Sequence, residues 1–220
     1  IVYDPELDQL YIGVGNGSPW NHRVRSPEGG DNLYLSSIVA LDPDTGEYLW
    51  HYQETPAETW DYTATQPIML ADMEVDGESR KVIWHAPKNG FFFVIDRESG
   101  ELISADPFAR INWATHYDME TGRPVETDIA RFPEQAELIR PSSIGAHNWH
   151  PMAFSPDTGY VYIPTMESLY QYVDDENFEF QWGHWNFGVD PEQPGVPDPV
   201  LSQFLIRKMI NEIISQVIFE

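Results

Sequence analysis

A turn motif that recurs along the chain constrains the fold more than any other feature of the sequence. "ALDPDTGEYLW" at residues 40–50 is echoed by "VIDRESGELIS" at residues 94–104, and a weaker copy, "DMETGRPVE", follows at residues 118–126. In each copy an Asp and a Thr or Ser precede a glycine, which supplies the positive φ of a tight turn. Apolar residues flank the turn on both sides, so each copy predicts two strands joined as a β-hairpin.

Other segments predict further hairpins. "IVYDPELDQLYIG" at residues 1–13 matches "MAFSPDTGYVYIP" at residues 152–164, and an Asn-Gly pair precedes the apolar run at residues 91–95. Eighteen prolines and fifteen glycines favour many short strands over long helices. Together the repeats predict an all-β chain and a β-propeller of four-stranded antiparallel blades, with a β-sandwich as the alternative. At roughly 40–50 residues per blade, and with long loops between strands, we expect about three to four blades.

The end of the chain breaks this pattern. Apolar residues in the stretch "LSQFLIRKMINEIISQVIFE" recur at helical spacing, which predicts a short amphipathic C-terminal helix. We therefore divide the chain into a propeller segment, residues 1–200, and a divergent helical tail, residues 201–220. Arg207 and Lys208 interrupt the tail, which is too mixed to span a membrane.

The charge of the chain excludes one class of function. Its formal net charge is −24, with 36 acidic residues against 12 basic ones, and a phosphate backbone needs a basic surface. Nucleic-acid binding is therefore excluded, and the acidity serves either solubility or the attraction of a cation or basic partner. The chain contains no cysteine, so no disulfide, thiolate metal site or haem-attachment motif lies within it. No signal peptide is visible either, and the chain begins as if inside a fold.

Two candidate functional residues lie in short loops of the first half. Asn16, in "GVGNGSPWN", sits among three glycines, where an amide can approach a ligand or metal without a crowding Cβ. Asp61, in "ETWDYTATQ", lies between Trp60 and Tyr62, and a carboxylate desolvated by such neighbours gains basicity. The alternatives are an ordinary Asn-Gly turn for the first and a turn-capping Asp for the second.

Two further candidates lie beyond them. Lys88, one of three lysines, precedes the predicted turn of "HAPKNGFFF" and can reach toward an anionic ligand. In "IGAHNWHP", the two histidines three residues apart are a weak zinc signal. Asn148 and Trp149 of that stretch are better suited to give one hydrogen bond and one stacking surface to a planar cofactor.

With these motifs in view, residues 1 to about 198 resemble the quinoprotein alcohol dehydrogenases, which use pyrroloquinoline quinone (PQQ). The resemblance rests on an ordered set of motifs that includes "GNGSPWN", "TWDYTATQ", "HAPKNGFFFVID", "GAHNWHPMAFSP" and "HWNFGVD". It is strongest toward the ethanol-type and quinohaemoprotein branch. The resemblance implies a partial eight-bladed propeller, with PQQ near the axis and Ca²⁺ beside it.

The resemblance also implies roles for individual residues. Asn16 matches the amide ligand of the metal, and Asp61 matches the catalytic base that also lies at the metal. Lys88 matches the cation that bonds the quinone oxygens, and Asn148 and Trp149 match a loop that contacts PQQ. The implied reaction oxidises a primary or small secondary alcohol by hydride transfer to PQQ, with electrons passed to a cytochrome c or a quinone.

Other implications concern the metal and the missing parts of the family pattern. Lanthanide-using relatives carry a second acid at the position of Thr63, so Thr63 favours calcium. The family's glutamate metal ligand and adjacent-cysteine disulfide match no part of this sequence, which implies a central fragment of a longer periplasmic enzyme. A haem c is implied only in a further C-terminal domain.

Two other functions remain as alternatives. A catalytically silent propeller of the same repeat type would act as a binding or assembly scaffold. A propeller glycosidase would need a second positioned acid near Asp61, and Glu58 lies too close to it in sequence.

Overall fold

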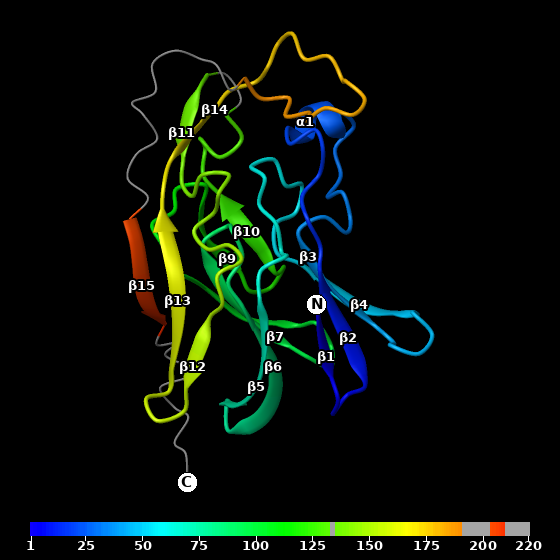
Figure 1. The fold of residues 1–220 in the computed structure, drawn as a ribbon, viewed down its shortest axis with the longest axis vertical. Coiled ribbons are helices and arrows are strands. Elements are labelled where there is room, and N and C mark those ends of the chain that lie inside the picture. The colour runs from blue at the N-terminus through cyan, green and yellow to red at the C-terminus, as the bar shows by residue number, and fades with distance from the viewer. Residues whose placement is uncertain (133–134, 191–202, 210–220) are drawn as a thin grey trace.

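The computed structural model describes residues 1–132, 135–190 and 203–209. Almost every regular element among them is a β-strand, and the helix α1 (His22–Arg25) is a single turn (Figure 1). The prediction of an all-β chain is confirmed. No helix in the described ranges is long and apolar enough to cross a bilayer.

Two four-stranded antiparallel sheets form the first half of the molecule. The first contains β1 (Val2–Asp4), β2 (Gln9–Gly13), β3 (Ser37–Leu41) and β4 (Tyr48–Gln53), paired in chain order. The second contains β5 (Ile68–Val75), β6 (Glu78–His85), β7 (Phe91–Asp96) and β8 (Leu102–Pro107), again in chain order. Such meandering four-stranded sheets are the unit of a β-propeller.

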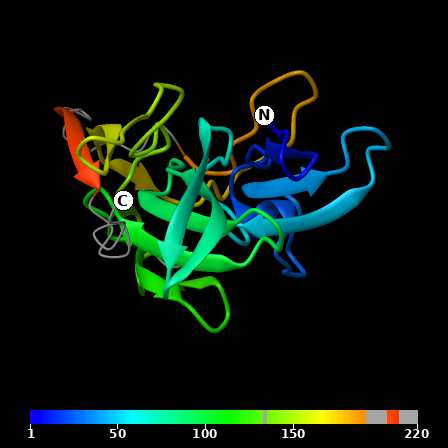
Figure 2. The same cartoon turned by 90° about the horizontal axis from the view of Figure 1, so that it is seen from below.

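The remaining described strands form smaller sheets. β9 (Ala114–Asp118) pairs with β10 (Arg123–Glu126), and β11 (Glu137–Ile139) pairs with β14 (Tyr170–Tyr172). β12 (Ala153–Ser155), β13 (Tyr160–Glu167) and β15 (Gln203–Met209) form a three-stranded sheet. The described residues thus hold two four-stranded units and three smaller antiparallel sheets, which agrees with the predicted partial propeller. The three larger sheets succeed one another across the molecule in chain order, as two perpendicular views agree (Figures 1 and 2).

The repeated turns have the local structure that their sequences predict. Asp42 Oδ1 accepts hydrogen bonds from the backbone N–H groups of residues 44 and 45, and Asp96 Oδ1 does the same for residues 98 and 99. Gly46 and Gly100 take the positive φ values, 73° and 77°. The weaker copy, between β9 and β10, repeats the pattern at Asp118.

The predicted C-terminal helix is wrong over Gln203–Met209, which form strand β15. This strand pairs antiparallel with β13 in a continuous register from Val161↔Met209 to Glu167↔Gln203. The edge of β13 offers a row of backbone donors and acceptors, and pairing with them overrides the helical spacing of the apolar residues. Residues 201–202 and 210–220 of the expected helix lie outside the described residues.

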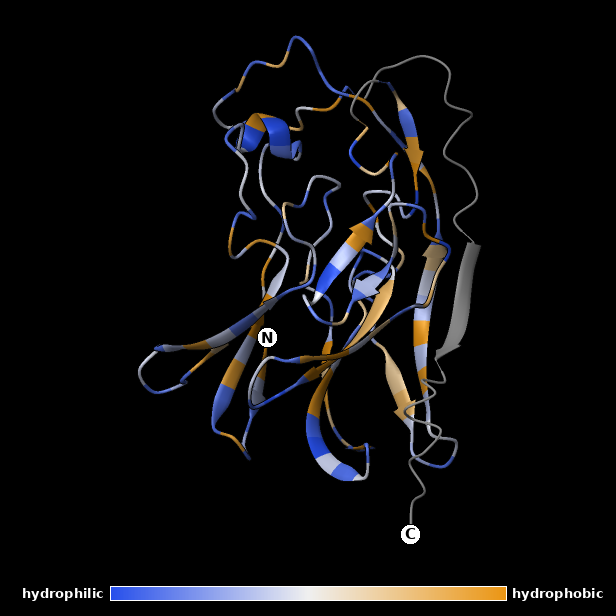
Figure 3. Ribbon diagram, turned by 180° about the vertical axis from the view of Figure 1, so that it is seen from behind, coloured by the Kyte–Doolittle hydropathy of each residue, from blue (hydrophilic) through white to orange (hydrophobic). Residues whose placement is uncertain are grey.

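Strand β7 is the centre of the core because it is buried on both faces. Phe91, Phe93 and Ile95 join an aromatic cluster that reaches the first sheet, whereas Phe92 and Val94 join a second cluster that reaches β13. Side chains alternate across a strand, so a strand between two packed layers reads as one continuous apolar run. Hydrophilic residues lie away from this core, at the β5–β6 tip and in α1, as the hydropathy colouring shows (Figure 3).

Candidate functional site

The Asp61 side chain lies in the long connection between β4 and β5 and contacts a residue from the neighbouring hairpin. Lys88 Nζ donates to Asp61 Oδ2 and to the Asp61 carbonyl oxygen, at 3.0 Å in both cases. Asp61 has φ of +67°, a left-handed conformation that costs a residue with a Cβ roughly 1–2 kcal/mol. Surrounding contacts must therefore hold this backbone in place.

The Asp61–Lys88 pair is mostly buried but remains accessible. The side chains are 19% and 11% exposed, respectively. Burial raises the pKa of Asp61, and the Lys88 ammonium and hydrogen bonding from Asn16 partly oppose that rise. The carboxylate is thus a stronger base than an ordinary aspartate and still reaches solvent.

Asn16 follows β2 and completes the group. Its Nδ2 donates to the Gly17 carbonyl oxygen at 3.1 Å, which orients the amide. The structure therefore brings Asn16, Asp61 and Lys88 together from three separate loops. Their roles as metal ligand, base and cofactor contact stay predictions.

The loop at residues 144–150 packs directly on Lys88. The N–H of Ala146 donates to the Lys88 carbonyl oxygen at 2.9 Å. Gly145 has φ of +92°, and a Cβ built on it would lie 2.4 Å from Lys88 Cγ. Only a glycine allows the loop to approach Lys88 so closely. The loop thus fixes the course of the Lys88 side chain.

The two residues of this loop that were predicted to contact the cofactor, Asn148 and Trp149, lie in different surroundings. Asn148 Nδ2 donates to the Ile144 carbonyl oxygen, while its Oδ1 is buried without a hydrogen-bond partner. A buried acceptor without a partner is uncommon and fits a site that a ligand completes. Trp149 is 78% exposed and does not join the Asp61–Lys88 pair.

The neighbouring histidine is structural. His147 is fully buried, and its ring nitrogens lie 2.6 Å from the Ala86 carbonyl oxygen and 2.8 Å from the His150 carbonyl oxygen. Both ring nitrogens are engaged by backbone, so this ring offers no free nitrogen to a metal.

The oxygen donors present suit a hard cation but are few. Asn16 and Asp61 offer amide and carboxylate oxygens, the ligand type that calcium prefers. Calcium takes six to eight oxygens, and in the described part of the chain no group of three or more His, Cys, Asp or Glu is placed so that it could hold a metal ion. The residues therefore fit part of a calcium shell. Thr63 brings no charge to it because threonine is neutral, and its hydroxyl is hydrogen-bonded to Thr65 and Gln66.

The aromatic neighbours of Asp61 do not line the site. Trp60 and Tyr62 are fully buried and stack on each other at a centroid distance of 5.4 Å. Trp60 Nε1 donates to the Ala130 carbonyl oxygen and the Tyr62 hydroxyl to the Pro141 carbonyl oxygen. The two rings anchor the loop in the core, and Asp61 lies at the turn between them.

Side chains from distant segments satisfy the carbonyl groups of this loop. Arg131 donates to the Ala57 carbonyl oxygen and lies over the Trp60 ring, 4.6 Å from its centroid. Three further carbonyls of the loop also accept: Glu58 O from Arg25, Trp60 O from Tyr172 and Tyr62 O from Ser36. A buried irregular segment needs such partners for its backbone.

The sequence interpretation missed the part that Glu58 plays. Glu58 is fully buried, and its Oε1 accepts from the backbone N–H groups of Trp60 and Tyr62 at 2.6 and 2.8 Å. Burial raises the pKa of Glu58 to about 7. The signal for this role is a single acid three residues before Asp61 inside an apolar, aromatic loop.

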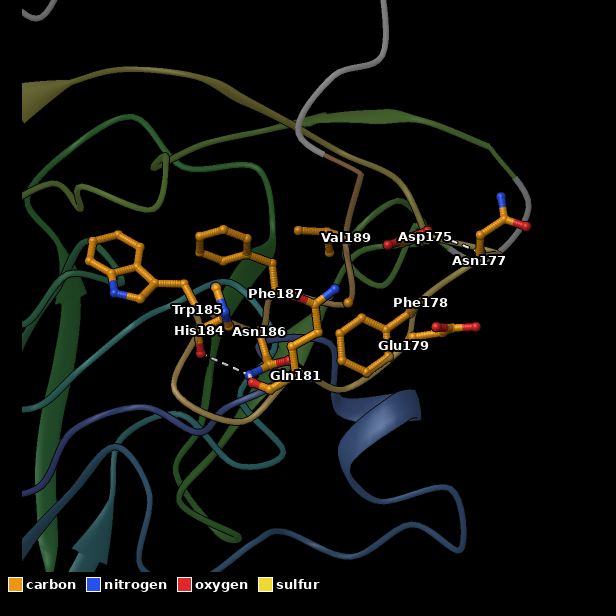
Figure 4. Close-up of a pocket in the computed structure, with 11 residues that line it drawn as sticks. Asp175, Asn177, Phe178, Glu179, Gln181, His184, Trp185, Asn186, Phe187 and Val189 are labelled. Carbon is orange, nitrogen blue, oxygen red and sulfur yellow. Dashed lines mark hydrogen bonds between the residues drawn. The ribbon is translucent and has the colours of Figure 1, made fainter.

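The structure also contains a cavity elsewhere. Residues of the 175–189 loop line an open pocket of about 500 Å³, beside α1 (Figure 4). No predicted site residue lines it, so it is separate from the Asp61–Lys88 pair.

Comparison with known proteins places this fold in one class, a segment of a PQQ-type β-propeller. Residues 1–106 match the family described as glucose/ethanol/alcohol dehydrogenase, β-propeller domain. Over 180 residues the chain is 57% identical to the quinohemoprotein alcohol dehydrogenase of Comamonas testosteroni, covering 82% of this chain and 25% of that protein.

Solved structures agree. The crystal structure of the Comamonas testosteroni enzyme matches with a TM-score of 0.83 at 51% identity, covering 89% of this chain and 31% of that one. A europium-containing methanol dehydrogenase matches with a TM-score of 0.79 at 39% identity, covering 85% of this chain and 32% of that one. The chain belongs to the PQQ-dependent alcohol dehydrogenase family, and it spans about a quarter to a third of the length of these relatives.

Proposed function

We propose that the protein oxidises a small primary or secondary alcohol to the aldehyde or ketone, with Asp61 as the general base. The observation that carries the proposal is the Asp61–Lys88 pair, a partly accessible carboxylate held beside an ammonium at 3.0 Å. Family membership supports the same chemistry.

The cofactor proposed is PQQ, which when bound supplies a hydride acceptor. Asp61 accepts the hydroxyl proton of the alcohol, and its raised pKa makes it a better base for that purpose. An ammonium has three N–H donors, and Lys88 directs hydrogen bonds to two oxygens of Asp61. Its third donor is available to a cofactor oxygen. Asn148 Oδ1, buried without a partner, is a second group that a cofactor donor can satisfy.

The metal proposed is calcium, held by Asn16 and Asp61 together with ligands from outside the described residues. Lanthanides carry one more positive charge and call for a further acid, whereas the position two residues after Asp61 is the neutral Thr63. Electrons pass to a cytochrome c or a quinone in this proposal, and the enzyme works in the periplasm.

The test uses the protein at its full natural length, with PQQ and calcium, in dye-linked alcohol oxidation. Asp61→Asn keeps the shape but removes the base, so we expect kcat to fall on the order of 10²–10⁴-fold. Asp72→Asn is the matched control, because Asp72 is a paired carboxylate on β5 away from this site. Equal activity of the two variants would refute the base assignment. A wild-type protein that binds PQQ but oxidises no alcohol would favour the scaffold alternative.

A further inference from the structure

The backbone around Asp61 is organised by a second carboxylate. Glu58 Oε1 accepts from both Trp60 N and Tyr62 N, the amides on either side of Asp61. One oxygen atom thus bridges the N–H groups of the residues before and after the left-handed residue. A positive φ at a non-glycine position persists only where the surroundings over-determine it.

The bridge is enclosed and connected to the rest of the fold. Glu58 has no solvent exposure, and Arg25 donates to its carbonyl oxygen. The second carboxylate oxygen, Oε2, is buried and has no hydrogen-bond partner. The hydrogen bonds therefore need an acceptor at Oε1 but not a second acceptor at Oε2.

We infer that Glu58 is the positioning residue for Asp61, acting as a hydrogen-bond template that holds the Asp61 backbone in its left-handed conformation and aims the carboxylate at the reacting alcohol. The inference rests on the proposed function, because positioning matters only if Asp61 is the base. The property that this role requires of Glu58 is the length of its side chain, which lets Oε1 reach both amides, and not its charge.

Two variants separate reach from charge. Glu58→Gln keeps an oxygen at the same reach, removes the charge and places its amide N–H₂ where Oε2 now lies without a donor against it. Glu58→Asp keeps the charge but is shorter by one methylene, so its oxygen withdraws from the two amides. We expect Glu58→Gln to keep kcat close to wild type and Glu58→Asp to lose kcat on the order of 10²-fold, with a smaller change in KM.

A second readout needs neither cofactor nor substrate. In the full-length protein without PQQ or metal, hydrogen exchange of the Trp60 and Tyr62 amides reports the bridge directly. We expect fast exchange in Glu58→Asp and wild-type protection in Glu58→Gln. Glu54→Asp is the matched control, since Glu54 is equally buried but bonds His85 at 2.6 Å instead of these amides. Glu54→Asp is expected to leave the protection of the Trp60 and Tyr62 amides unchanged, once any change in global stability is subtracted.

Loss of protection in Glu58→Gln equal to that in Glu58→Asp would overturn the inference, because the charge of Glu58 would then be required as well as its reach. Unchanged protection in both variants would overturn it as well. If the wild-type protein oxidises no alcohol, the proposed function fails, while the exchange experiment still decides whether Glu58 holds this backbone.

Discussion

Lys88 Nζ donates to both the carboxylate and the carbonyl oxygen of Asp61, at 3.0 Å each, across 27 residues of sequence. The two bonds come from one ammonium, so they fix the Asp61 side chain relative to its own backbone. They also place a positive charge against the proposed base. The pair is thus a positioning contact and an electrostatic one at once.

Removal of the Lys88 charge should change the pH dependence of activity. Lys88 lowers the pKa of Asp61, so Lys88→Gln is expected to raise that pKa further. A base must be deprotonated to act, and the acidic limb of the kcat/KM profile is therefore expected to move to higher pH. Lys81→Gln, which removes a lysine bound to Glu6 at the surface, serves as the control and should leave the limb in place. An acidic limb at the same pH in Lys88→Gln would contradict this coupling.

A methyl group at Gly145 should displace Lys88. In Gly145→Ala the new Cβ meets Lys88 Cγ at 2.4 Å, so we expect reduced kcat and a lower melting temperature. Gly159→Ala separates this clash from backbone strain, since Gly159 also has a positive φ, of +66°, with open space around it. Both variants should lose on the order of 1 kcal/mol to strain, and only Gly145→Ala should lose activity. Equal kcat in the two would show that the contact with Lys88 is unimportant.

Glu58 should make folding stability depend on pH. Burial raises its pKa to about 7 in the folded protein from 4.5 for an unperturbed glutamate, so the stabilisation is fully present below pH 4.5 and is lost as pH rises through 7. At about 1.4 kcal/mol per pKa unit, the loss is roughly 3 kcal/mol. Glu58→Gln does not titrate and should gain stability over wild type at pH 8 relative to pH 5. Chemical denaturation at both pH values measures this difference, and parallel curves would contradict it.

Arg131 and Arg123 should contribute differently to the free energy of unfolding. Arg131 donates to the Ala57 carbonyl oxygen, pairs with Glu126 and covers Trp60, so Arg131→Ala leaves buried groups without partners. We expect a loss of roughly 2–3 kcal/mol. Arg123→Ala breaks an exposed pair with Asp31 and should cost about 0–1 kcal/mol. Denaturant unfolding of the two variants tests the order, and a larger loss in Arg123→Ala would reverse our assignment of the loop anchors.

The hairpin turns follow from the sequence because all their determinants are local. Asp42 and Asp96 bond amides two and three residues ahead, and Gly46 and Gly100 relieve the steric cost of the turn. A short stretch of chain therefore contains everything that such a turn needs. The continuous apolar run of β7 likewise indicates a strand buried on both faces.

The C-terminal strand and the orientation of the aromatic residues beside Asp61 depend on distant partners. β15 exists because the edge of β13 is there to pair with it. Trp60 and Tyr62 point into the core because Ala130 and Pro141 offer carbonyl oxygens there. Residue types alone show that these side chains are large and aromatic. They do not show which side of Asp61 is buried away from solvent.

The sequence by itself determined the all-β hairpin architecture, the family and the identity of Asn16, Asp61 and Lys88 as candidates. Only the tertiary structure decided that these residues meet, that Trp149 lies apart from them, and that Glu58 bridges the amides around Asp61. The physical reason is range. The interactions that form a turn act over a few consecutive residues, so the local sequence specifies them. A buried site is formed by hydrogen bonds and packing between segments that the chain brings together only on folding.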